Sequence, residues 1–154
     1  MAAHELEPLL GTSHFRVLIG EREIGFSQVS TLSSRSDPPT GDERPRSRFD
    51  TVVLRRALTR STELYEWRRR VSNGEVDLRD VTIQQLEAAG GSIVNAWRLV
   101  EAWPCRWSGP AFDALDNAIA YEEVELVFAD LVWLEGRSQP PHRSPPSEAT
   151  TEGA

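Results

Sequence analysis

The sequence contains no lysine, a single cysteine (Cys105) and three histidines, at positions 4, 14 and 142. One cysteine cannot form an intramolecular disulfide or by itself build a cysteine-based zinc site, so a disulfide scaffold and a zinc ribbon are excluded. No uninterrupted apolar run approaches the roughly 18 residues of a membrane-spanning helix, which argues against a direct membrane anchor. Residues 1–11 lack the basic and apolar regions of a secretory signal, so synthesis in the cytoplasm is expected.

The composition is that of one ordinary globular domain, with 154 residues, of which 39% are hydrophobic and 27% charged. The formal net charge of -7 argues against nucleic-acid binding, because neutralising phosphates requires a basic surface. Residues 55–70 contain six arginines and two glutamates, whereas residues 113–135 contain seven acidic residues and no basic one. This asymmetry favours a charged partner, including another copy of the chain.

Three segments are too polar to belong to a core. Residues 1–12 are expected to be a flexible lead-in, and the proline-rich residues 136–154 to be disordered and dispensable. Between them, residues 13–135 form the predicted domain. Residues 33–48, here called the arm, contain no apolar side chain apart from prolines, which predicts an exposed loop or arm that interrupts the domain.

Most of the domain has the alternation of β-strands. Residues 15–19 and 25–32 are predicted to form a hairpin around a polar turn at 21–23. Further strands are expected at residues 51–58, at 81–87 and 92–101 around a glycine turn at 89–91, and at 118–134. The last stretch is assigned to strand rather than helix because Val124 and Leu126 alternate with Glu123 and Glu125.

One helix is predicted to follow residue 62. Leu64, Trp67 and Val71 fall at i, i+3 and i+7, on one face of a helix. Gly74 can adopt the left-handed conformation that ends a helix. Trp67 is therefore expected in the core, packed beneath the helix.

Several phrases resemble, in order and spacing, the tail-tube proteins of contractile phage tails and phage-tail-like contractile injection systems. The phrases are FRV at 15–17, GFSQVS at 25–30, LRRALT at 54–59 before ELYEW at 63–67, EAWPCRWSGP at 101–110 and VEL at 124–126. The chain departs from the family in its arm, which lacks the usual Lys-Leu-Pro-Gly phrase, and at Ala57, where glycine is usual.

The resemblance implies a small antiparallel β-sandwich or β-barrel with one flanking helix, and a structural role without catalysis or cofactor. Six copies would form a ring, and stacked rings would form the inner tube, with sheath and baseplate proteins as partners and a cargo in the lumen. Such a particle is released or acts on a membrane. Two alternatives stay open: a specialised ring at one end of the tube, and a monomeric β-barrel that binds a small apolar ligand.

The candidate residues are therefore structural ones. The acidic residues of 113–125 are best explained as a solvated face rather than a catalytic or metal site. Arg106 would lower the pKa of Cys105, yet a half-buried structural thiol is the better interpretation. The expected subunit-interface residues are Asp37, Arg44, Arg46, Arg48, Arg68, Arg69, Glu123 and Glu125. The expected core residues, besides Trp67, are Trp103, Pro104 and Trp107.

Overall fold

A computed structural model describes residues 9–134, which are mainly β with one helix, as the sequence predicts. The expectations for residues 1–8 and 136–154 lie outside the described residues. In chain order the elements are β1 (Phe15–Ile19), β2 (Arg22–Ile24), β3 (Gln28–Val29), β4 (Ser34–Ser36), β5 (Ser47–Phe49), β6 (Val52–Ala57), α1 (Glu63–Ser72), β7 (Arg79–Leu86), β8 (Ile93–Ser108), β9 (Tyr121–Val127) and β10 (Asp130–Leu134).

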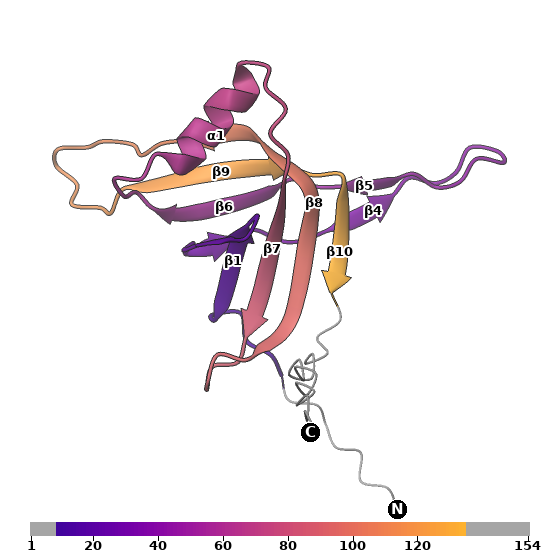
Figure 1. Ribbon diagram of the computed structural model, residues 1–154, viewed down its shortest axis with the longest axis horizontal. Coiled ribbons are helices and arrows are strands. Elements are labelled where there is room, and N and C mark those ends of the chain that lie inside the picture. The colour runs from indigo at the N-terminus through magenta and orange to yellow at the C-terminus, as the bar shows by residue number, and fades with distance from the viewer. Residues whose placement is uncertain (1–8, 135–154) are drawn as a thin grey trace, which may run out of the picture.

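Eight of the ten described strands form one antiparallel sheet in the order β2-β1-β7-β8-β9-β6-β3, with β10 paired to β8. The 16-residue strand β8 joins its two parts: the first half pairs with β7 and β10, and the second half pairs with β9. Figure 1 shows β7, β8 and β10 running across the direction of β6 and β9. The sheet therefore folds over along β8, and its two parts enclose the core.

Strand β8 is longer than predicted, because it continues past residue 101 to Ser108. Glu101 has a positive φ of 51°, and the register with β9 shifts between Pro104 and Arg106. A left-handed residue and a bulge bend a strand without ending it. Pro104 lies at this irregular point, where the lack of an N–H donor is tolerated.

The predicted hairpin near the start is wrong in its details. The turn lies at Gly20 and Glu21, where Gly20 adopts a φ of 62°, and residues 22–24 form β2 rather than a turn. Residues 25–32 contain only the short strand β3, which pairs with β6 and not with β1. A two-residue turn with a left-handed glycine matches the twist of the flanking strands better than the longer polar turn that we predicted.

The predicted strand over residues 118–134 is divided into β9 and β10, and residues 118–120 belong to a loop. The chain turns at Phe128 and Ala129 and crosses from one part of the sheet to the other, because β9 pairs with β6 whereas β10 pairs with β8. The alternation within β9 is confirmed, since Val124 and Leu126 are buried. Periodicity alone could not show the crossing, because both strands are apolar on one side.

Helix α1 packs over the core as its apolar face predicts. Trp67 is 0% exposed and Leu64 is also buried, while Val71 is partly buried against them. The helix ends in a Schellman motif, in which Gly74, with a φ of 90°, donates its N–H to the Val71 carbonyl, and Glu75 donates to the Arg70 carbonyl.

An acidic side chain ties the end of α1 to the start of β7. Asp77 Oδ2 lies 3.1 Å from Arg70 Nε and 2.9 Å from Arg79 Nη2. The hydrogen bonds from Arg79 hold the pKa of Asp77 below its ordinary value of 3.8; burial opposes this shift, and Arg70 reinforces it. The carboxylate is therefore stabilised in the folded state.

We expect the free energy of unfolding to depend on the ionisation of Asp77. Because its pKa is lower in the folded than in the unfolded state, the stabilisation is fully present above pH 3.8 and is lost as the pH falls through the folded pKa. Urea denaturation at a series of pH values should show Asp77→Asn losing this part of the pH dependence. Asp42→Asn, on the exposed arm, is the control. An identical acid profile for Asp77→Asn and the wild type would contradict this role.

Candidate subunit interface

The arm is a polar ribbon that stands away from the rest of the chain. Strands β4 and β5 pair with each other from Ser34↔Phe49 to Ser36↔Ser47, and they form a separate two-stranded sheet. In Figure 1 this ribbon projects from one end of the molecule. Phe49, at its base, packs against Phe128 with a centroid distance of 5.5 Å. Residues 34–48 are exposed.

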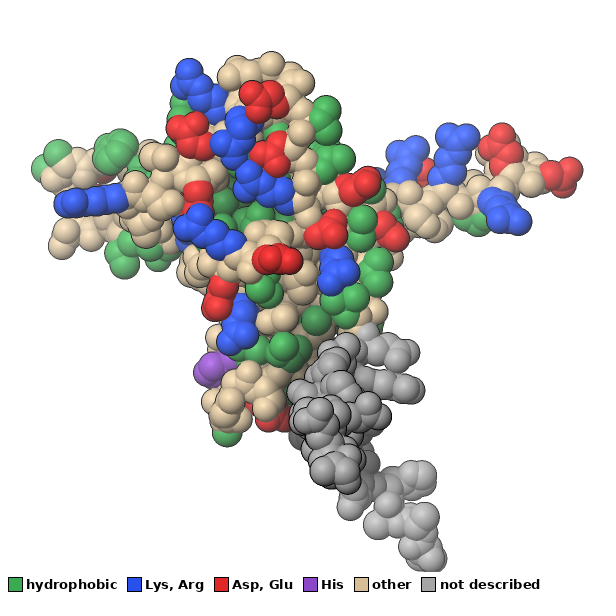
Figure 2. All heavy atoms as spheres, in the orientation of Figure 1, with side chains coloured by type: hydrophobic (Ala, Val, Ile, Leu, Met, Phe, Trp, Pro, Cys, Tyr) green, Lys and Arg blue, Asp and Glu red, His purple; other side chains and the backbone are tan. Residues whose placement is uncertain are grey.

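The predicted interface residues of the arm lie on both sides of its tip. Arg48 Nε is 2.7 Å from Asp37 Oδ2, so these two residues hold the two strands of the arm together. Arg44 and Arg46 have no ion-pair partner within residues 9–134, and both are exposed. Figure 2 shows basic and acidic side chains along the projection. Arg44 and Arg46 are therefore free to meet a partner.

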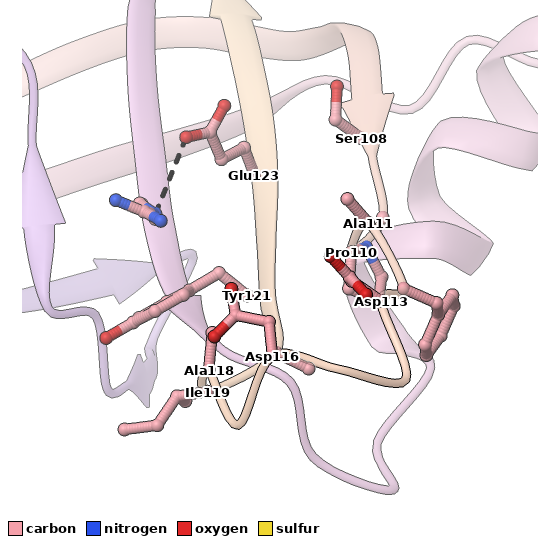
Figure 3. A pocket seen from close by; sticks show the side chains of 13 residues that line it. Ser108, Pro110, Ala111, Asp113, Asp116, Ala118, Ile119, Tyr121 and Glu123 are labelled. Carbon is pink, nitrogen blue, oxygen red and sulfur yellow. Dashed lines mark ion pairs between the residues drawn. The ribbon is translucent and has the colours of Figure 1, made fainter.

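The opposite end of the molecule is formed by residues 109–120, here called the β8–β9 loop (Figure 1). An open groove of about 740 Å³ lies between this loop and strand β9. Figure 3 shows Asp113 and Asp116 on the loop and Tyr121 and Glu123 on β9 beside them. The lining residues are Arg55, Ser108–Asp113, Asp116, Ala118–Tyr121 and Glu123. We call this site the loop groove.

The β8–β9 loop exposes three large apolar side chains. Phe112 is 89% exposed, Leu115 98% and Ile119 67%. Three large exposed apolar side chains in one loop favour a contact surface, whereas single ones are ordinary. This surface was not predicted from the sequence, because the acidic residues were interpreted as a solvated face and Ile119 was assigned to a strand. The phrase Gly109-Pro110, which is a turn signal, could have revealed the loop.

The structure brings the arginine-rich and acidic stretches together within one chain. Strand β6 pairs with β9, so Arg55 lies opposite Glu123 and Arg56 opposite Glu122. Arg55 Nε is 3.6 Å from Glu123 Oε1, whereas Arg56 Nε is 2.9 Å from Glu122 Oε1 in a buried pair. Part of the charge asymmetry that we assigned to contacts between copies is therefore neutralised inside the subunit.

The other predicted interface residues lie on α1 and β9. Arg69 Nη1 donates to the Tyr65 hydroxyl at 3.3 Å. Arg68 has no ion-pair partner in the described part of the chain. Glu125 Oε1 accepts a hydrogen bond from the Thr51 hydroxyl at 2.6 Å. The eight predicted residues are therefore spread over the arm, α1 and β9.

The tryptophan-rich end of β8 has a structural arrangement. Pro104 is fully buried, while Trp103 and Trp107 are partly buried. Trp107 packs against the core and meets Tyr65 edge to face at 5.2 Å. A Cβ atom on Gly109 would lie 2.8 Å from the Trp107 ring, which explains why glycine stands two residues after this tryptophan. Trp103 lies outside the buried core cluster.

Cys105 is not activated by its arginine neighbour. Burial raises the pKa of this thiol, and Glu125 raises it further. These two effects outweigh the lowering of the pKa by Arg68 and Arg106. The thiol lies 3.5 Å from the Glu125 carbonyl oxygen, to which it can donate. Within residues 9–134 no three His, Cys, Asp or Glu side chains are grouped to hold a metal ion. The described helix is too short and too polar to cross a membrane.

The described residues thus form a folded-over antiparallel sheet with one packed helix, a projecting arm and a loop that exposes apolar side chains. Residues 11–132 match the family model of the T4-like virus tail tube protein gp19. The chain therefore belongs to the tail tube protein gp19 family. Comparison with curated proteins finds no match.

Solved structures share this fold. A chain of the extended sheath–tube complex of PVC, an extracellular contractile injection system, is 24% identical, with a TM-score of 0.68 over 84% of this chain and 94% of that one. A chain of the PVC sheath/tube terminator is 25% identical, with a TM-score of 0.71 over 84% and 99%. Hcp1 from Flavobacterium johnsoniae is 15% identical, with a TM-score of 0.59 over 77% and 93%.

Proposed function

We propose that this chain is a structural inner-tube subunit of a contractile injection system. Six copies form a ring, and stacked rings form the conduit or projectile. Membership of the tail tube family supports this role. The observation that carries it is the placement of the exposed arm and the apolar β8–β9 loop at opposite ends of the subunit (Figure 1). Two different contact surfaces on one chain join copies head to tail, which produces a ring or a stack rather than an isolated pair.

The partners follow from this role. Similar chains come from a sheath–tube complex and from the baseplate of the anti-feeding prophage. We therefore propose sheath and baseplate proteins as partners outside and below the tube, and a cargo in its lumen. We further propose that the protein acts by assembly rather than by catalysis, which its membership of the tail tube family supports.

A specialised ring at the end of the tube is the second candidate. Similarity to the PVC sheath/tube terminator and to the tube-terminating cap of the anti-feeding prophage, both with a TM-score of 0.71, supports it. A monomeric ligand-binding barrel is less well supported. Large side chains, including Trp67 and Leu54, are fully buried in the interior, and the loop groove lies outside this core.

Self-association is expected to weaken with salt but to persist. Exposed ion pairs contribute about 0.2–1 kcal/mol each and are screened by salt, whereas apolar contacts such as those of Phe112 and Leu115 are not. Light scattering after size-exclusion chromatography should give the mass of six copies or a multiple of it in low salt, and a smaller associated fraction in high salt. A monomer at all salt concentrations, also with a crowding agent, would contradict the proposed function.

A further inference from the structure

We propose that the loop groove of one copy binds a proline-rich segment near the C-terminus of a neighbouring copy. The segment is residues 136–147, here called the proline segment, which lie outside the described residues. The match to the tail tube family ends at residue 132, so the proline segment lies beyond the part of the chain that matches the family. The inference rests on the proposed function, because it names a contact between copies of an assembled subunit.

The loop groove presents aromatic and aliphatic side chains to an incoming chain. Phe112 and Ile119 line it and are 89% and 67% exposed. Tyr121 lines it from β9, and the Arg55 guanidinium, 4.0 Å from the centroid of the Tyr121 ring, helps to hold this ring in place (Figure 3). Covering these side chains would remove apolar surface from water, which stabilises a bound partner.

The charge of the loop groove favours a basic occupant. Its lining includes three carboxylates and one guanidinium, and the Arg55 guanidinium is paired with Glu123 at 3.6 Å. Asp113 and Asp116 have no ion-pair partner within residues 9–134. The unpaired charge beside the apolar walls is therefore negative. A segment that combines rigid apolar groups with arginines complements both properties.

The proline segment has this composition. It contains the pairs Pro140-Pro141 and Pro145-Pro146, together with Arg137 and Arg143, and no acidic residue. Proline-rich segments dock in grooves with aromatic walls, and they lose little conformational entropy because their extended form is largely set before binding. Proline has no N–H group, so packing it against the rings leaves no donor unpaired. Arg143 lies between the two pairs and would meet the free carboxylates.

The path of the chain favours the groove of a neighbouring copy. Leu134 pairs with Ala96 near the start of β8, whereas the groove lies beyond Ser108, where β8 ends. This stretch of β8 is about 40 Å long at about 3.3 Å per residue. An extended proline-rich chain rises about 3.1 Å per residue, so Pro146 reaches about 37 Å from Leu134. Binding in its own subunit would therefore need an almost fully stretched chain, a constraint that a groove on an adjacent copy removes.

Peptide binding tests the contact separately from assembly. The probe is a fluorescently labelled synthetic peptide of residues 135–154. The receptor is the full chain carrying Arg137→Glu and Arg143→Glu, so that its own proline segment competes poorly. Fluorescence anisotropy should show binding, and adding Asp113→Arg with Asp116→Arg should weaken it by about tenfold or more, because two attractions are replaced by repulsions. Equal binding with and without the two groove changes would overturn the proposal.

Three controls separate docking from misfolding, net charge and composition. Asp113 Oδ1 accepts the Leu115 N–H at 3.0 Å, so circular dichroism must show that the groove variant is folded. Glu75→Arg with Glu87→Arg makes the same change in net charge at exposed sites outside the groove and should leave binding unchanged. A peptide of the same composition that separates the proline pairs should bind more weakly. Equal binding of this peptide would overturn the proposed recognition of the proline segment.

Cross-linking shows which copy supplies the proline segment. In a Cys105→Ser background, chains with Ser144→Cys are mixed with differently tagged chains that carry Ala111→Cys in the groove. Mild oxidation should link the two kinds of chain, whereas Glu75→Cys in place of Ala111→Cys should give little linkage. A chain carrying both Ser144→Cys and Ala111→Cys that forms only an internal disulfide would overturn the contact between copies.

Failure of this contact is distinguishable from failure of the proposed function. Tubes that assemble without peptide binding or cross-links would overturn the contact and leave the tube function intact. A chain that binds the peptide in its groove but never forms rings or tubes would support the groove contact and contradict the proposed function. Because ring formation does not depend on the proline segment, its removal is expected to weaken self-association several-fold without abolishing it.

Discussion

Replacing Trp67 with alanine is expected to destabilise the subunit by about 3–5 kcal/mol. The indole is completely buried between α1 and the sheet, so truncation leaves a cavity in the core. Its Nε1–H donates to the Asp77 carbonyl oxygen at 2.9 Å, and the Arg79 guanidinium lies 4.7 Å from the ring centroid. The substitution therefore removes packing, a hydrogen bond and a cation–π contact together.

Trp133→Ala is the matched control for this prediction. Trp133 is 64% exposed, on the edge strand β10, where it contacts Trp97 at a centroid distance of 5.4 Å. Its truncation should cost about 1 kcal/mol or less, in line with the worth of an exposed aromatic pair. Urea denaturation followed by circular dichroism measures both. Equal losses at the two positions would show that Trp67 is not the main packing element of α1.

Glu122→Ala is expected to destabilise the subunit by about 3 kcal/mol, because it leaves the buried Arg56 without its closest partner. Arg56 Nε lies 2.9 Å from Glu122 Oε1, and the two side chains are 8% and 2% exposed. Glu63 Oε1, 3.2 Å from Arg56 Nη1, still neutralises part of the charge. This places the expected loss at the low end of the range for broken buried pairs.

The neighbouring Glu123→Ala provides the control on the same strand. Glu123 faces the other side of β9, with a side chain that is 46% exposed and 3.6 Å from Arg55. Exposed pairs contribute about 0.2–1 kcal/mol, so this truncation should have a small effect. Chemical denaturation of both variants at neutral pH makes the comparison. A loss below 1 kcal/mol for Glu122→Ala would mean that solvent reaches the pair when one partner is removed.

Local signals explain the elements that could be predicted from the sequence. The helix at Glu63–Ser72 has a strong 3.6-residue period in Leu64, Trp67 and Val71, together with its glycine stop. The alternation of Val124 and Leu126 with glutamates likewise identifies β9. In both cases a few adjacent residues determine the element.

The elements that were predicted wrongly depend on residues far apart in the sequence. The crossing at Phe128 and Ala129 follows from pairing with two different strands, β6 and β8, which local periodicity does not reveal. Strand β8 continues through Glu101 because β9 pairs with its second half. Periodicity registers which residues are apolar, but it does not show which strand will lie beside them.

The candidate interface could be predicted in part. The arm was visible as a polar, proline-containing stretch, and Arg44 and Arg46 are exposed on it. The loop groove could not be predicted, because Phe112 and Leu115 form no periodic pattern. Their exposure follows from the position of the loop at the end of β8. The pairing of Arg55 with Glu123 within one chain depends on the register of β6 and β9, which the sequence does not specify.

Electron cryo-microscopy of the protein assembled at high concentration tests the proposed tube function most directly. The expected image is a hollow tube of stacked rings of six copies, with the arm of each copy in contact with a neighbouring copy. The bent sheet and α1 of the subunit should fit the density without rearrangement. Isolated monomers, or closed pairs that do not stack, with a small molecule bound inside the sheet, would contradict a tube subunit and favour the ligand-binding alternative.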